Sequence, residues 1–185
     1  MKRVFVFLVL FAALALADIA AQQAATAAAA ELSFSYTKQG GHATNQFAVW
    51  IEDNQGHYIK TLYATRFTAN GGWKRRESSI PLWVKQSDLA NMTKAQVDAL
   101  TGATPKAGTL TYRWDGTDSR NTALPPGDYV MCLEGTLRWE AQVRCRANIK
   151  VGQGPAASVV TTEYIGTPPG NEREMITAVT VRTLR

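Results

Sequence analysis

The chain is 185 residues long, 45% hydrophobic and 19% charged, with a formal net charge of +5, and this length suits one domain that buries its own core. Removing the two positive charges of Lys2 and Arg3 at the start of the chain leaves +3 for the remainder. A nucleic-acid-binding protein would gather Lys and Arg on one stripe with interleaved aromatic residues, whereas the densest basic cluster here is only Lys74-Arg75-Arg76. We therefore expect no nucleic-acid partner.

Residues 1–17 have the pattern of a cleavable signal peptide. Two basic residues precede an unbroken apolar run over 4–17, which is shorter than the roughly 20 residues that span a bilayer and ends in a small-x-small cleavage sequence. Residues 18–30 are rich in alanine, with no pattern that would bury one face, and predict a flexible tether before a folded domain over 31–185. Because no cysteine follows the run directly and no later segment is apolar enough to span, we expect a periplasmic or secreted protein without stable membrane insertion.

Short runs with period-two alternation dominate the folded part. In the run over 47–51, for example, Phe47, Val49 and Ile51 share one face, which is typical of a strand. Turn-forming residues separate the runs. The pattern predicts strands over 32–36, 47–51, 58–67, 109–114, 128–137, 140–151, 158–165 and 175–184. This number of short strands favours a mainly β, antiparallel sandwich.

A different period interrupts the β pattern at about residues 80–104, where apolar residues fall at helical spacing. Thr93 followed by Gln96 is a capping-box start, and Gly102 stands where helices commonly end. The sequence therefore predicts a helical insert with one short helix over about 94–100.

The chain has two cysteines, Cys132 and Cys145. An oxidising compartment favours a disulfide between an even pair, and a hairpin between the two would place them on neighbouring strands. The bond also requires a close approach of the two Cα atoms, which sequence spacing does not establish. The sequence leaves open whether Cys132 and Cys145 are bonded or free.

Residue patterns that carry hydrolytic or metal-dependent catalysis are scarce. His42 and His57 are the only histidines, each follows a glycine, and neither belongs to an HxH or HExxH motif. Glu52 and Asp53 are adjacent in a strand-forming region, so their side chains should point to opposite faces and share no acid–base task. We expect no independent enzyme activity and no metal site.

Two turn sequences are similar to those of a known β-sandwich domain. Trp114-Asp115-Gly116, followed by Pro125-Pro126-Gly127-Asp128-Tyr129, resembles the WDG turn and PxGxY strand start of the immunoglobulin-like domain in flagellar hook-capping scaffold proteins. The resemblance implies an immunoglobulin-like antiparallel sandwich and says nothing about activity.

A wider set of segments, 45–53, 58–62, 101–105 and 135–139, is similar to a bacterial family of predicted periplasmic proteins of unknown function. That resemblance covers nearly the whole mature domain. It implies a secreted protein of immunoglobulin-like fold, encoded beside flavin transferases and PepSY-type membrane redox proteins.

The segment Asp98-Ala99-Leu100-Thr101-Gly102-Ala103-Thr104 is similar to the DxxTGAT acceptor sequence of proteins that carry covalent FMN. The resemblance implies that a flavin transferase joins the FMN phosphate to the hydroxyl of Thr104. Asp98 and Thr101 would then serve in recognition, while Gly102 and Ala103 keep the loop slim. One departure is that the motif lies in a helical insert of a predicted sandwich, and a glycine with Pro105 beyond it is also an ordinary helix end.

Two functions follow from these patterns. The first is an electron-relay protein that carries FMN on Thr104 and has a membrane redox protein as its partner. In this protein, Trp73 and Trp83 would offer a wall on which the flavin ring stacks, and Lys106 would lie near the FMN phosphate. The second is a cofactor-free immunoglobulin-like binding or accessory module for such a protein. Under the second function, both tryptophans fill the core beneath the insert.

Overall fold

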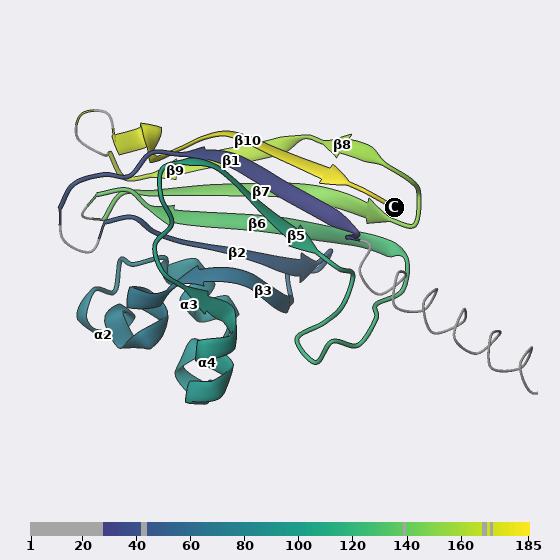
Figure 1. The fold of residues 1–185 in the computed structure, drawn as a ribbon, viewed down its shortest axis with the longest axis horizontal. Helices are drawn as coiled ribbons and strands as arrows, with labels where there is room; N and C mark the ends of the chain where they lie inside the picture. Colours follow the sequence, from purple (N-terminus) through teal and green to yellow (C-terminus); the bar gives the residue numbers. More distant parts are fainter. Residues whose placement is uncertain (1–27, 42–43, 139, 168–169, 171) are drawn as a thin grey trace, which may run out of the picture.

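The computed structural model describes residues 28–41, 44–138, 140–167, 170 and 172–185 (Figure 1). The predicted signal peptide, nearly all of the predicted tether, His42 and Trp139 lie outside the described residues. The strands are β1 (Ala30–Tyr36), β2 (Gln46–Asp53), β3 (Tyr58–Thr65), β4 (Thr101–Gly102), β5 (Gly108–Trp114), β6 (Gly127–Thr136), β7 (Gln142–Val151), β8 (Ala156–Ser158), β9 (Val160–Ile165) and β10 (Ile176–Thr183).

The helical segments are short, and all but one lie between β3 and β4. They are η1 (Thr68–Gly72), α2 (Trp73–Arg75), α3 (Pro81–Gln86), η2 (Leu89–Asn91), α4 (Lys94–Leu100) and, before β10, η3 (Glu172–Met175). In the part of the chain that the structure describes, no helix is long and apolar enough to cross a membrane.

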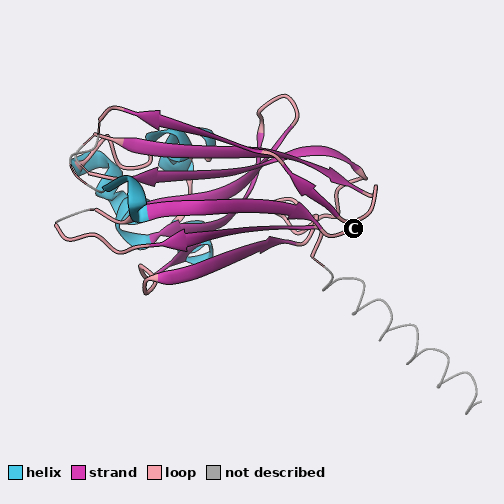
Figure 2. Ribbon diagram, turned by 90° about the horizontal axis from the view of Figure 1, so that it is seen from above, coloured by secondary structure: helices cyan, strands magenta, loops and turns pink. Residues whose placement is uncertain are grey.

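The strands form two sheets that face each other, as the view in Figure 2 shows. One sheet has the order β5-β1-β10-β8 and the other the order β4-β3-β2-β6-β7-β9. The strand pairs are antiparallel, except that the two-residue β4 runs parallel to β3. Each strand predicted from the alternation is present, and the predicted immunoglobulin-like antiparallel sandwich with short helices is confirmed.

Strand β2 shows why the domain has two apolar layers. Phe47, Val49 and Ile51 face the core between the sheets, whereas Ala48 and Trp50 face a second cluster on the outer side of the six-stranded sheet. All five side chains are buried, because alternate residues of a strand point to opposite faces and both faces of β2 are covered.

The second layer is the helical insert, which lies beneath β2 and β3 in Figure 1. Trp83 on α3 is fully buried there, and Leu89 and Val97 join it. The insert begins at η1, well before the predicted start near residue 80. The earlier start depends on a tertiary contact: Thr68 is buried, and its hydroxyl forms a hydrogen bond with the Ser79 hydroxyl at 2.6 Å. The spacing of apolar residues in the sequence does not predict this contact.

A buried carboxylate on β6 ties the insert to the sheet. Glu134 is fully buried and accepts hydrogen bonds from the backbone N–H groups of Leu82 and Trp83 at 3.2 and 2.9 Å. Arg144 Nε also donates to it at 3.0 Å. Burial nevertheless raises the pKa of Glu134, since desolvation outweighs these bonds. The carboxylate is therefore an anchor within the protein rather than a group offered to a ligand.

The structure decides the question about the two cysteines: both thiols are free. In the β6–β7 register, Cys132 lies opposite Arg146, and Cys145 lies opposite Leu133. This offset of one residue sends the side chains to opposite faces of the sheet, Cys132 into the helix-covered cluster and Cys145 into the core between the sheets. A disulfide between them is therefore sterically excluded in this register.

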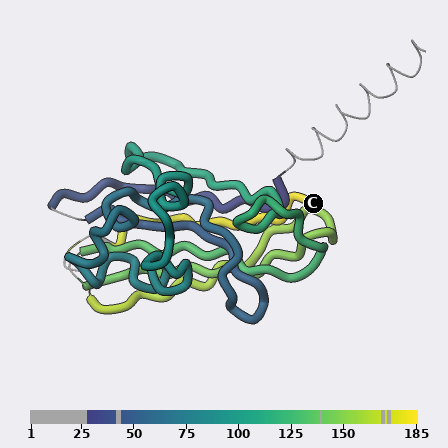
Figure 3. Tube along the Cα trace, turned by 90° about the horizontal axis from the view of Figure 1, so that it is seen from below, coloured from purple at the N-terminus to yellow at the C-terminus, as the bar shows by residue number. Residues whose placement is uncertain are grey.

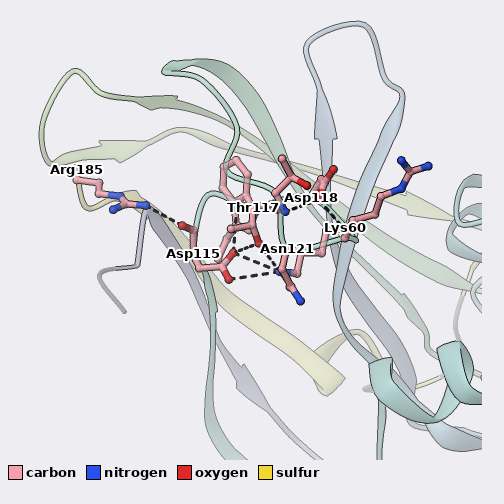
Figure 4. Close-up of polar contacts among 9 residues, drawn as sticks. Lys60, Asp115, Thr117, Asp118, Asn121 and Arg185 are labelled. Atoms are coloured by element: carbon pink, nitrogen blue, oxygen red, sulfur yellow. Dashed lines mark hydrogen bonds and ion pairs between the residues drawn. The ribbon is translucent and has the colours of Figure 1, made fainter. Parts of the chain in front are cut away.

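The WDG turn after β5 is held by its own side chains (Figure 4). Asp115 accepts bonds from the backbone and hydroxyl of Thr117 at 3.0 and 2.7 Å. Lys60 reaches in from β3, with its Nζ 2.6 Å from Thr117 Oγ1 and 3.2 Å from Asn121 Oδ1. Arg185, near the C-terminus, donates to the Asp115 carbonyl at 2.7 Å. These bonds connect the turn to β3 and to the C-terminal residue.

The start of β1 and the end of β10 lie side by side (Figure 3). The Leu184 N–H donates to the Ala29 carbonyl at 2.8 Å, and the Ala29 N–H donates to the Trp114 carbonyl. The first described residues are thus held between the C-terminal strand and the WDG turn.

Candidate functional site

The DxxTGAT motif begins on α4, and the predicted helix limits are confirmed as Lys94–Leu100. Thr93 and Gln96 form the predicted capping box: Gln96 N donates to Thr93 Oγ1 at 3.3 Å, and Thr93 N donates to Gln96 Oε1 at 2.8 Å. Val97 faces inward while Asp98 is exposed. The local sequence therefore defines α4, and Asp98 is accessible from outside.

After α4, the motif runs along the sheet edge and then leaves it. Thr101 and Gly102 form β4 and pair with Ala64 and Thr65 of β3. Residues 103–107 then carry the chain across to the four-stranded sheet, and Ala103 and Thr104 are exposed in this loop. Thr104, the predicted acceptor, is thus an exposed residue of this loop.

Tyr63 of β3 holds the motif in place. Its hydroxyl donates to the carbonyl of Ala103 at 2.7 Å. Its ring lies against Gly102, where an added Cβ would meet Tyr63 Cε2 at 2.6 Å. Gly102 has an ordinary φ, so the space taken by the ring, and not backbone conformation, requires glycine at this position.

Tyr63 belongs to an aromatic cluster that joins the two sheets. Its ring centroid is 5.1 Å from that of Phe47 and 5.0 Å from that of Tyr112, and Tyr36 lies 5.5 Å from Phe47. Burial raises the pKa of Tyr63 and of Tyr36 to about 12 and raises the pKa of Tyr112 as well. These phenols stay protonated at neutral pH, so the Tyr63 hydroxyl is a constant donor to the loop.

One motif hydroxyl has no partner. Thr101 Oγ1 is buried, and among the described residues nothing forms a hydrogen bond with it. Thr101 pairs with Ala64, which faces the helix-covered cluster, so this hydroxyl lies on the side of the sheet away from Tyr63. The loop also carries one cation, Lys106, and no acidic side chain between residues 103 and 107. These residues fit attachment of a phosphate-linked group at Thr104.

The predicted stacking wall is not found at the motif. Trp83 is fully buried, and its Nε1 donates to Thr61 Oγ1 at 2.9 Å. Trp73 is half-buried against the same helix-covered cluster, with Lys74 Nζ 5.3 Å from its ring centroid. Tyr63 packs on the opposite side of the sheet and contacts Gly102 and Ala103, and the sequence analysis did not single it out.

The two carboxylates weighed as an acid–base pair point apart, as predicted. Glu52 is fully buried and accepts bonds from Trp50 Nε1 at 2.8 Å and Arg146 Nη2 at 2.7 Å. Asp53 faces the hairpin turn and lies 2.8 Å from His57 Nδ1. In the described part of the chain, no group of three or more His, Cys, Asp and Glu residues is arranged to hold a metal ion.

A polar cleft of about 630 Å³ lies between the start of β3, the insert and the WDG turn. Its lining includes Tyr58 and Lys60 of β3 and Leu100 of α4. Because β4 runs parallel to β3 and pairs near its end, Thr104 lies beyond Thr65, away from the Tyr58 end that lines this cleft. The cleft therefore borders the helical part of the motif, at Ala99 and Leu100, and Thr104 is not among its lining residues.

These features define a β-sandwich protein that presents a threonine-bearing loop where the chain crosses between its sheets. Residues 27–167 match the family described as "Predicted periplasmic protein (DUF2271)", and the chain belongs to this family. The resemblance stated for segments 45–53, 58–62, 101–105 and 135–139 is thereby confirmed. The description also agrees with the periplasmic or secreted location expected from residues 1–17. No curated protein and no solved structure matches the chain.

Proposed function

We propose that this protein is a periplasmic electron-relay component that carries FMN covalently on Thr104 and serves a membrane redox partner. The observation that carries the proposal is the exposed Thr104 hydroxyl at the end of a DxxTGAT sequence. Asp98 is exposed on the helix before it, so both ends of the motif are accessible to a second protein.

The modification is a phosphoryl transfer in which every group is accounted for. Thr104 Oγ1 attacks the FMN-side phosphorus of FAD, and the bond from that phosphorus to the bridging oxygen breaks. AMP leaves with that oxygen, and the hydroxyl proton passes to a base of the transferase. The product is a phosphodiester between FMN and Thr104. When bound, the isoalloxazine ring supplies the redox chemistry, and the protein supplies position and surroundings.

The alternative is a cofactor-free immunoglobulin-like module that binds or supports a membrane redox protein. Exposed apolar groups beside an edge strand favour it: Val159 is 89% exposed, and Tyr164 on the edge strand β9 is 39% exposed. Edge strands offer unpaired backbone groups to a partner. Such a module would remain colourless and unmodified.

The experiment is intact mass measurement of the full chain co-expressed with a flavin transferase in the periplasm. Thr104→Ala is the test variant and Thr109→Ala the matched control, because Thr109 is also an exposed threonine and lies on the following strand. We expect one FMN, less the water lost in forming the bond, on the wild type and on Thr109→Ala but not on Thr104→Ala. An unmodified wild-type chain would leave the binding module as the function.

A further inference from the structure

We infer that Tyr63 is a positioning residue for the modification: its hydroxyl and ring hold the Gly102–Ala103 backbone so that Thr104 is presented to the transferase. The inference rests on the proposed function and adds a residue that lies outside the motif, 41 positions before Thr104 in the chain.

The contact acts on the backbone next to the acceptor. The Tyr63 hydroxyl donates to the Ala103 carbonyl at 2.7 Å, which holds this carbonyl toward β3 one residue before Thr104. The ring lies directly against Gly102. Two consecutive residues before the acceptor are therefore held by one side chain, and Thr104 follows them into solvent.

Without Tyr63, little else would hold this segment. Strand β4 has only two residues, and their pairing with Ala64 and Thr65 is the whole of its connection to the sheet ladder. On the α4 side, Leu100 is partly buried against the helix-covered cluster four residues before Thr104, and Val97 is buried seven residues before it. A reacting hydroxyl on a free loop samples many orientations, whereas a held one meets the transferred phosphorus more often.

The support behind Tyr63 is rigid. Its ring packs with Phe47 and Tyr112, and both sheets contribute to this cluster. Burial raises the pKa of Tyr63 to about 12. The hydroxyl therefore stays protonated, and can donate its hydrogen bond, throughout the pH range in which a transferase would act. The loop is thus attached to the aromatic cluster between the sheets through a hydrogen bond whose donor stays protonated at neutral pH.

The test compares Tyr63→Phe with Tyr129→Phe in the purified, unmodified full chain. Tyr129 is the matched control because its hydroxyl also donates to a backbone carbonyl, that of Pro125, at 2.7 Å, but in a different turn. Each protein is incubated with FAD and limiting transferase, and the gain of FMN is followed by intact mass. Hydrogen exchange at the Ala103, Thr104 and Lys106 amides is measured in the absence of transferase.

We expect Tyr63→Phe to gain FMN about fivefold more slowly, the change that corresponds to one net hydrogen bond, while Tyr129→Phe matches the wild type. Exchange at Ala103 and Thr104 should be faster in Tyr63→Phe alone. A modified wild type together with an unchanged rate in Tyr63→Phe would overturn the inference and leave the proposed function intact. A wild type that stays unmodified with excess transferase would overturn both.

Discussion

Replacing Gly102 by alanine tests whether the aromatic side chain explains the motif glycine. The added Cβ would lie 2.6 Å from Tyr63 Cε2, so the ring must move. Movement would break the 2.7 Å bond to Ala103 and weaken the packing of the Tyr63 ring against Phe47 and Tyr112. Because Gly102 has an ordinary φ, alanine brings no backbone strain of its own.

The expected cost follows from these contacts. One net hydrogen bond contributes about 1 kcal/mol, and partial loss of two aromatic contacts adds roughly 1 kcal/mol. At a position whose backbone conformation suits both residues, replacing glycine by alanine stabilises the fold by roughly 0.5 kcal/mol, because it lowers the conformational entropy of the unfolded chain. We therefore expect Gly102→Ala to lower the free energy of unfolding by about 1.5 kcal/mol.

Urea denaturation of a double-mutant cycle with Tyr63→Ala measures this. In the Tyr63→Ala background there is no ring to meet, so Gly102→Ala should be neutral or slightly stabilising. Gly40→Ala is the control, because no atom lies within 4 Å of its added Cβ and its φ is ordinary. If Gly102→Ala costs the same with and without the Tyr63 ring, the steric explanation is wrong.

Two further predictions concern the sandwich itself. Bonds from Arg182 and Arg113 lower the pKa of Glu31, so its ionised form stabilises the fold above the unfolded pKa of 4.5, and this contribution is lost as pH falls through the lower folded pKa. Glu31→Gln should therefore lower the free energy of unfolding by about 1 kcal/mol at pH 7, a small effect because both arginines are largely exposed. Near pH 3 the effect should be much smaller. Thermal unfolding at both pH values measures this, and an equal loss at both would contradict the prediction. Burial raises the pKa of both Cys132 and Cys145, and both thiols are shielded, so iodoacetamide should label neither in the native protein and both after unfolding without reductant. Absence of labelling in the unfolded protein would indicate a disulfide after all.

The sequence predicts best the strands and helices whose formation depends on residues that are near one another in the chain. Period-two alternation locates the long strands, because alternate residues of a strand point to opposite faces and those that face the core between the sheets are apolar. The limits of α4 are predicted to the residue, because the Thr93–Gln96 capping box is made and satisfied within one turn.

Predictions that depend on distant contacts fare less well. The insert begins at Thr68 rather than near residue 80, because its first turn depends on buried hydroxyl bonds to Ser79 and to the Gln46 side chain. The state of Cys132 and Cys145 depends on the β6–β7 register, and a shift of one residue reverses the face of every side chain.

By itself, the sequence predicted the periplasmic location, the sandwich class and the acceptor-like motif, because each of these depends on patterns among neighbouring residues. Only the tertiary structure decided that Tyr63 is the residue against which the motif is held. Tyr63 and Gly102 are 39 positions apart, and they meet because β4 returns to pair with β3 after the whole insert has folded. Contacts between residues so far apart in the chain depend on the packing of the intervening segment, which leaves no periodic or local trace in the sequence.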